Sequence, residues 1–375
     1  MSLEKLIEAS RYYGSNPEYV LAGGGNTSYK DEDFLFVKAS GISLGSIQGD
    51  GFVKMERRAL SAIWKKDYPE NSDAREAAVL ADMMASRCPG EESKRPSVET
   101  LLHDLLPFSY VIHTHPALVN GLCCSRDGEK AARELFPNAA WIPLINPGYV
   151  LSKFVKEVID KRPRVSNIII LLQNHGIFVA ADSIQEINEV YKTVMQTLNQ
   201  KIVKTPDFDN SVSTFGNSEI IKKQILAAAE KNHPDKPWLI KFERNNQIAA
   251  FVSDNAAFKP VSSAYTPDHM VYSGSDPLFI DEVVLKDMSG FEAVFKDHAE
   301  KKGRIPKIIA VKELGIFGLE HSEKAVDNAL ELFGDTQKVA VYSESFGGPF
   351  FMNDSMIHFI NNCEVERYRS HIAVK

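Results

Sequence analysis

The sequence predicts an α/β protein, with a helix-covered sheet over residues 1–212 and a C-terminal α/β lobe of uncertain role over 213–375. Three observations predict this class. Helical and extended patterns alternate through the first half of the chain, the segment 204–217 is polar and rich in turn residues, and helical and extended patterns resume beyond it. Hydrophobic residues make up 44% of the chain, which is enough to build a substantial core.

The elements of the first part follow from apolar spacing and turn residues. Apolar residues at helical spacing predict helices at 1–19, 55–68, 72–87, 98–106 and 183–203. Short apolar runs bounded by glycine or polar turns predict strands at 20–30, 33–43 and 109–115, and a strand, turn and strand over 167–181. The helix at 98–106 is expected to end before Pro107.

The second part is less regular. A helix is predicted at 218–232, and the segments 248–254 and 269–274 look extended. A weak internal echo links 168–183 with 307–322, and it places Leu314 where the first copy has His175. Either these are two generic strand-turn-strand units, or the second lobe is a related build that has lost a metal ligand.

Composition excludes several classes of protein. The net charge of −7 argues against a general nucleic-acid binder, and no apolar run approaches the length of a membrane span. The N-terminus does not resemble a signal peptide, and the four cysteines lack paired CxxC spacing. We therefore expect a cytoplasmic protein with reduced thiols that binds neither nucleic acid nor membrane.

Two histidines stand one residue apart at the end of the strand 109–115. Residues i and i+2 of a strand share a face, so His113 and His115 present both imidazoles on one side. Pro116 cannot continue a central strand and places the pair at a strand end. His175 lies in a second strand-end turn, and three imidazoles with an open fourth position suit zinc, although other divalent ions remain possible.

A carboxylate precedes this strand. Ser97 is a good N-cap for the helix at 98–106, and it places Glu99 in the first helical turn. Glu99 then either complements the helix dipole or acts as a general base beside the metal. His103 lies one turn further on, and we expect it to have a structural or supporting role.

Two glycine-bearing loops suit an anion. The loop 23–28 offers backbone N–H groups with Asn26 and Ser28, and the loop 38–43 offers Lys38, Ser40 and Gly41. Each is an ordinary turn when taken alone. If they lie near Ser97 at a helix N-terminus, they form a phosphate cradle.

Together these motifs resemble the class II aldolase/adducin family over roughly residues 5–205. The stretches that carry the resemblance are GGGNTS, KASG, RPSVETLLH, VIHTHP and LLQNHGIFV. The chain is most similar to the aldolase part of bifunctional rhamnulose-1-phosphate aldolase/alcohol dehydrogenase proteins. It contains no GxGxxG strand-helix unit, so we do not expect the dehydrogenase part here.

The resemblance implies a three-layer α/β/α fold around a largely antiparallel sheet, in a homo-oligomer. It implies zinc bound by His113, His115 and His175, with Glu99 as catalytic acid/base. It further implies that substrate phosphate is bound by Asn26, Ser40, Gly41 and Ser97. Many members have a second serine where this chain has Val98, and that departure puts the phosphate site in question.

The predicted function is a zinc-dependent aldolase that cleaves a ketose phosphate of the rhamnulose or fuculose 1-phosphate type. Its intermediate would be a metal-stabilised enediolate, with a small sugar phosphate as the ligand. Two alternatives remain. One is a sugar-phosphate 4-epimerase or dehydratase with the same metal site, and the other is a non-catalytic, adducin-like scaffold.

Overall fold

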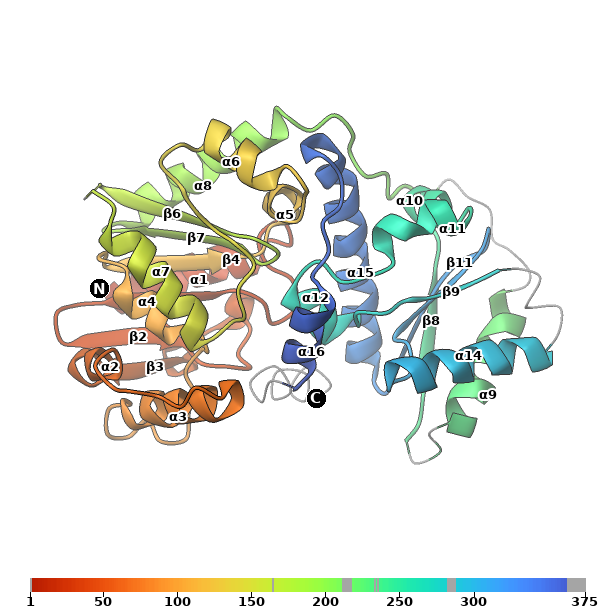
Figure 1. Ribbon diagram of the computed structural model, residues 1–375, viewed down its shortest axis with the longest axis horizontal. Coiled ribbons are helices and arrows are strands. Elements are labelled where there is room, and N and C mark those ends of the chain that lie inside the picture. Colours follow the sequence, from red (N-terminus) through yellow and green to blue (C-terminus); the bar gives the residue numbers. More distant parts are fainter. Residues whose placement is uncertain are drawn as a thin grey trace. The chain divides into compact units, whose positions relative to one another are not determined.

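A computed structural model describes residues 2–163, 165–210, 218–232, 234, 236–281 and 288–362. They form two compact units (Figure 1). The first unit comprises the residues up to Lys201 except Cys124–Arg126, which join the second unit with Ile202–Asn361. The predicted boundary between residues 212 and 213 lies outside the described residues, as does Cys363. The other three cysteines are buried, and no disulfide joins them.

The first unit holds a seven-stranded sheet in the order β3-β2-β1-β4-β7-β6-β5. Its strands are β1 (Asn26–Lys30), β2 (Phe34–Lys38), β3 (Phe52–Glu56), β4 (Tyr110–Thr114), β5 (Ala140–Ile142), β6 (Asn167–Leu172) and β7 (Gly176–Ala181). Its helices are α1 (Ser2–Gly14), α2 (Arg57–Ile63), α3 (Ser72–Ala85), α4 (Thr100–Leu105), α5 (Ala117–Cys123), α6 (Gly128–Leu135), α7 (Tyr149–Asp160) and α8 (Ile184–Asn199). Neighbouring strands are antiparallel except β5 and β6, which are parallel.

Helices cover both faces of this sheet. On one face, Leu102 of α4 and Val155 of α7 pack with Phe178 of β7 in one buried cluster. On the other face, the hydroxyl of Tyr191 in α8 accepts a hydrogen bond from Thr114 Oγ1 at 2.9 Å. Burying a side chain of this size contributes about 1.5–3 kcal/mol, so the sheet holds both helical layers. The predicted three-layer α/β/α fold with a largely antiparallel sheet is confirmed.

Two predicted elements were wrong, and the bounds of a third were shifted. The predicted helix 55–68 begins only at Arg57, because Phe52–Glu56 pairs with β2 as strand β3. The segments 248–254 and 269–274, predicted as extended, lie largely in helices. These are α10 (Asn246–Phe251) and α12 (Pro267–Tyr272).

Capping residues explain the two unexpected helices. Asn245 Oδ1 accepts the N–H of Ile248 at 2.8 Å, and Thr266 Oγ1 accepts the N–H of His269 at 3.3 Å. Pro267 follows the second cap, at a position where a helix tolerates proline. In so short a run, the spacing of apolar residues does not distinguish a strand from a helix. Here the capping residues favour the helix.

The second unit holds a four-stranded sheet in the order β8-β11-β10-β9. Its strands are β8 (Leu239–Glu243), β9 (Leu278–Ile280), β10 (Ile308–Val311) and β11 (Gly315–Glu320). The remaining helices after residue 201 are α9 (Ser218–Asn232), α11 (Asn255–Phe258), α14 (Met288–Lys302), α15 (Glu323–Ser343) and α16 (Asp354–Asn362).

This second sheet repeats half of the first. The order β4-β7-β6-β5 corresponds to β8-β11-β10-β9, and in both the last two strands are parallel and the other pairs antiparallel. α8 follows β7 as α15 follows β11, and each helix is capped by a serine, Ser183 and Ser322. In the turns before β7 and β11, Asn174 and Glu313 both have positive φ, at 56° and 59°. The weak sequence echo therefore marks a repeated supersecondary unit.

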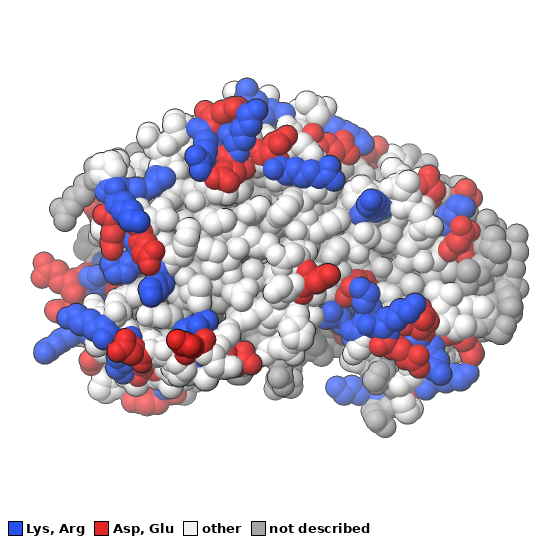
Figure 2. Space-filling model, viewed as in Figure 1, with Lys and Arg blue, Asp and Glu red and all other residues white. Residues whose placement is uncertain are grey.

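Lysine and arginine intermingle with aspartate and glutamate on the face shown in Figure 2. Among the described residues, no helix is both long enough and apolar enough to cross a bilayer.

Candidate metal centre

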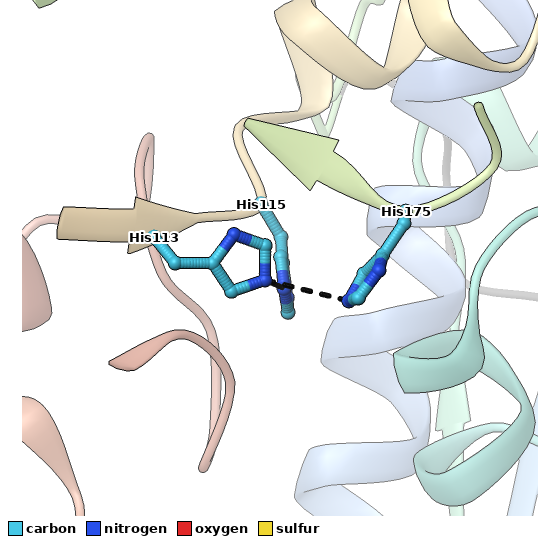
Figure 3. Close-up of side chains that lie close together, drawn as sticks. All are labelled: His113, His115 and His175. Atoms are coloured by element: carbon cyan, nitrogen blue, oxygen red, sulfur yellow. Dashed lines mark hydrogen bonds between the residues drawn. The ribbon is translucent and has the colours of Figure 1, made fainter. Parts of the chain in front are cut away.

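The three predicted histidines converge on one point (Figure 3). His113 Nε2 lies 2.9 Å from His115 Nε2 and 3.4 Å from His175 Nε2. The potential ligand atoms of the three rings all lie within 4.8 Å of one another. His113 and His115 come from the end of β4, and His175 comes from the turn between β6 and β7. The paired strands β4 and β7 thus bring residues that are far apart in the sequence to one place.

The environment of His113 prepares its Nε2 atom for a metal ion. His113 Nδ1 donates a hydrogen bond to the carbonyl oxygen of Ile177 at 2.9 Å. A carbonyl oxygen only accepts, so the proton of the neutral ring is on Nδ1 and the Nε2 lone pair faces the other histidines. The ring also stacks on Phe178, with centroids 3.9 Å apart. This fixed tautomer and orientation are what a ligating imidazole requires.

The turn that carries His175 depends on two residues. Asn174 has a φ of 56°, a left-handed conformation that asparagine adopts more readily than most residues. A Cβ atom added at Gly176 would lie 2.5 Å from the carbonyl oxygen of Thr114 and 2.8 Å from His115 Cδ2. Only glycine allows β7 to start this close to β4, and that approach places His175 opposite the other two rings.

Glu99 reaches the same point from α4. The helix begins at Thr100, later than predicted, so Glu99 is its N-cap residue and Ser97 lies in the preceding turn. There the hydroxyl of Ser97 accepts the N–H of Glu99 at 3.2 Å. Glu99 Oε2 lies 3.4 Å from His113 Nε2, and Glu99 Oε1 lies 3.7 Å from His175 Nε2.

The Glu99 carboxylate is only partly satisfied. Oε2 accepts a hydrogen bond from Asn26 Nδ2 at 2.6 Å, whereas the buried Oε1 has no hydrogen-bond partner among the described residues. A buried carboxylate oxygen without a donor is costly, which is the reason to look for a ligand or a cation there. Three imidazole Nε2 atoms beside an orphan carboxylate oxygen form a donor set that suits a divalent ion such as zinc.

Of the predicted phosphate residues, Asn26 lies in the centre itself. It pairs with His113 across β1 and β4. Its contact with Glu99 was not foreseen, because only this strand pairing brings the two together. Gly25, the residue before Asn26, has a φ of 63°, and a Cβ there would lie 2.8 Å from the carbonyl oxygen of His113. Gly25 therefore allows a close backbone approach to the centre.

The other predicted phosphate residues lie in two adjoining segments. The N–H of Ser40 donates to the carbonyl of Arg95 at 2.8 Å, and the N–H of Ser97 donates to the carbonyl of Lys38 at 3.2 Å. These bonds join the loop of Ser40 and Gly41 to the segment that leads into Glu99. Ser97 is buried, and Gly41 is exposed with a φ of 85°.

The repeat in the second unit has no such donor set among its described residues. By strand register, Phe242 takes the place of His113, and it contacts Phe317 as His113 contacts Phe178. The next equivalent position after the strand holds Arg244 in place of His115. Its Nη1 donates to the carbonyl oxygens of Glu313 and Leu314 in the turn itself. The second copy thus has a guanidinium and apolar groups where the first has three histidines.

Comparisons with known proteins find a family match over the first part of the chain. The family model described as "Class II Aldolase and Adducin N-terminal domain" matches residues 4–201. A Bacillus subtilis (strain 168) protein named "Uncharacterized oxidoreductase YuxG" is 27% identical over an alignment of 303 residues that covers 74% of this chain. The chain spans 42% of the length of that relative.

Two solved structures are each similar to about half of this chain. The N-terminal class II aldolase domain of a conserved protein from Thermoplasma acidophilum is 27% identical, with a TM-score of 0.45, covering 53% of this chain and 92% of that one. L-fuculose-1-phosphate aldolase from Thermus thermophilus is 14% identical, with a TM-score of 0.34, covering 52% and 92%. Because the family model covers more than half of the 375 residues, the chain belongs to the class II aldolase and adducin family.

Proposed function

We propose that this protein is a zinc-dependent aldolase that cleaves a ketose phosphate into two smaller carbonyl compounds. The observation that carries the proposal is the orphan Oε1 of Glu99, which is buried 3.7 Å from His175 Nε2 in a three-histidine cluster. A scaffold has no use for an ionisable group left without a donor beside three inward-facing imidazoles, whereas a proton-transfer catalyst needs such a group.

His113, His115 and His175 would hold the ion through their Nε2 atoms. When bound, the ion supplies a Lewis acid that polarises the carbonyl group of the substrate. The residues around the three histidines hold their rings in the orientation that binds the ion. Ile177 and Phe178 set the His113 ring, and the tight turn at Gly176 sets His175.

Glu99 would move the proton. In the direction of synthesis, its carboxylate takes the proton from the carbon next to the substrate carbonyl, and in cleavage it returns that proton to the same carbon. Glu99 is almost fully buried, and its free Oε1 faces the histidine cluster. A general base must come within hydrogen-bond reach of the proton that it removes. Oε1 would meet this requirement for a substrate bound at the histidine cluster.

The segments of Ser40, Gly41 and Ser97 would receive the phosphate. They are joined to one another by backbone hydrogen bonds and lead directly into Glu99. A remote phosphate held there would orient the reacting carbon and contribute binding energy. Val98 offers no hydroxyl at the position between Ser97 and Glu99, so this phosphate site would rely on backbone N–H groups other than those of Ser40 and Ser97, and on the hydroxyls of the two serines.

The test is a screen of ketose 1-phosphates with the zinc-loaded protein, following the release of dihydroxyacetone phosphate. Glu99→Gln keeps the shape of the side chain and its contact with Asn26, and it should retain zinc but lose cleavage. If the Gln variant cleaves as fast as the parent, the role of Glu99 is wrong. Product analysis separates the alternatives, because an epimerase returns an isomer and a dehydratase releases water. A scaffold holds no stoichiometric zinc.

A further inference from the structure

The carboxylate of Glu99 is the end of a chain of buried hydrogen bonds. Asn26 Nδ2 donates to Glu99 Oε2, so the amide of Asn26 turns its oxygen away from the carboxylate. That oxygen meets Nε2 of His103. Nδ1 of His103 in turn lies 2.7 Å from the hydroxyl oxygen of Ser28. All four side chains are at most 7% exposed.

The direction of every bond in this chain follows from its two ends. A carboxylate accepts, so the Asn26 amide nitrogen faces Glu99 and the amide oxygen must accept from His103. His103 therefore carries its proton on Nε2. Burial lowers the pKa of the His103 imidazole well below its usual value, so the ring is neutral and its Nδ1 accepts from Ser28. Bonds aligned in one direction polarise and reinforce one another.

The surroundings hold His103 in place. Its ring packs edge-on against Phe178, with centroids 5.6 Å apart, and the same Phe178 ring stacks on His113. The side-chain nitrogen of the buried Lys30 donates to the His103 carbonyl oxygen at 2.6 Å. The side chain of His103 thus has one orientation available, set by the same aromatic ring that sets a predicted metal ligand.

We propose that His103 is a positioning residue for Glu99, acting through Asn26. Because Oε2 is held by Asn26, the carboxylate cannot rotate to give its unpaired Oε1 a donor, and Oε1 stays aimed at the histidine cluster. This inference rests on the acid/base role proposed for Glu99. His103 itself does not touch the reacting atoms.

The first experiment reads the network without any reaction. Selective ¹⁵N labelling of histidine in the full-length, zinc-loaded protein shows by NMR which ring nitrogen of each histidine carries the proton, and His103→Gln assigns the His103 signals. The structure requires His103 to be neutral and protonated on Nε2 at pH 7, and His113 to be protonated on Nδ1. A proton on Nδ1 of His103, or on both nitrogens, would overturn the proposal.

The second experiment compares His103→Leu with His103→Gln in the zinc-loaded protein. The Leu variant leaves Asn26 free to turn, so we expect kcat to fall about 10- to 100-fold while KM and bound zinc change little, since small misplacements of a catalytic group cost rates of this order. The Gln variant, whose amide nitrogen can still donate to Asn26, should recover much of kcat.

His269→Gln is the matched control, because His269 is a buried histidine of the second unit whose hydrogen bonds go to Tyr265 and Asp335. It should lower stability and leave kcat per bound zinc unchanged. If His103→Leu loses activity only in proportion to its loss of zinc or of folded protein, His103 is merely structural. If the wild-type protein cleaves no sugar phosphate, the proposed function fails, and the NMR measurement still decides the network.

Discussion

Replacing Gly176 with alanine tests how the fold sets the spacing of the three histidines proposed to bind zinc. The added Cβ would lie 2.5 Å from the carbonyl oxygen of Thr114, whereas real contacts of this kind stay above 3.0 Å. The start of β7 must therefore move away from β4 by at least about 0.5 Å. Ligand distances in a metal site hold to within about 0.2 Å, so His175 can no longer complete the set. We expect zinc affinity to fall about 10- to 100-fold.

Gly315→Ala is the matched control, because Gly315 begins β11 at the equivalent position of the repeat. There the added Cβ would lie 2.7 Å from the carbonyl oxygen of Glu243, and φ is 154°. Both variants should lose about 1–3 kcal/mol of stability through overpacking, measured by denaturant unfolding. Only Gly176→Ala should lose zinc in competition with a chromophoric chelator. Equal zinc affinity in the two variants would refute the idea that strand approach sets the ligand triangle.

Three further predictions concern other parts of the molecule. Burial lowers the pKa of Lys30 from 10.5 to about 7, so between those values the unfolded chain binds a proton that the folded chain does not. Stability should therefore fall as pH drops from about 10 to 7, by up to about 1.4 kcal/mol per pH unit, and thermal unfolding of Lys30→Met should show a weaker slope. The protein should bind one zinc ion per chain by elemental analysis, and His113→Ala should bind none, because the second copy has Phe242 and Arg244 at the ligand positions. A second ion that survives His113→Ala would contradict this. Thr266→Ala removes the cap of α12 and should cost about 1 kcal/mol in denaturant unfolding, whereas an unchanged stability would mean that packing alone holds this helix.

The sequence was informative wherever a local pattern decides the structure. The spacing of His113 and His115 and the glycine after His175 placed three imidazoles at strand ends, and the structure brings them together. The contact between Asn26 and Glu99 could not be foreseen, because it depends on β1 pairing with β4. For the same reason, the replacement of His115 by Arg244 became visible only from the strand register.

The misassigned elements have a different cause. The runs at 248–254 and 269–274 are too short for their apolar period to distinguish a strand from a helix. Asn245 and Thr266 are the signals that could have identified α10 and α12, since both are strong capping residues directly before the helix. Ser97, the cap predicted for α4, does not begin the helix. Its segment pairs with the Lys38 loop through backbone hydrogen bonds, and the helix starts later, with Glu99 as its N-cap residue.

The most direct test of the metal-dependent acid/base mechanism is hydrogen exchange on dihydroxyacetone phosphate in deuterated water, without any aldehyde. It isolates the proton transfer assigned to Glu99 and does not depend on which sugar is the substrate. We predict that the zinc-loaded protein exchanges one hydrogen next to the carbonyl group. We also predict that His113→Ala does not, and that Glu99→Gln keeps its zinc but exchanges at least about 100-fold more slowly. Exchange at the parental rate in Glu99→Gln, or none in the zinc-loaded parent, would contradict the account.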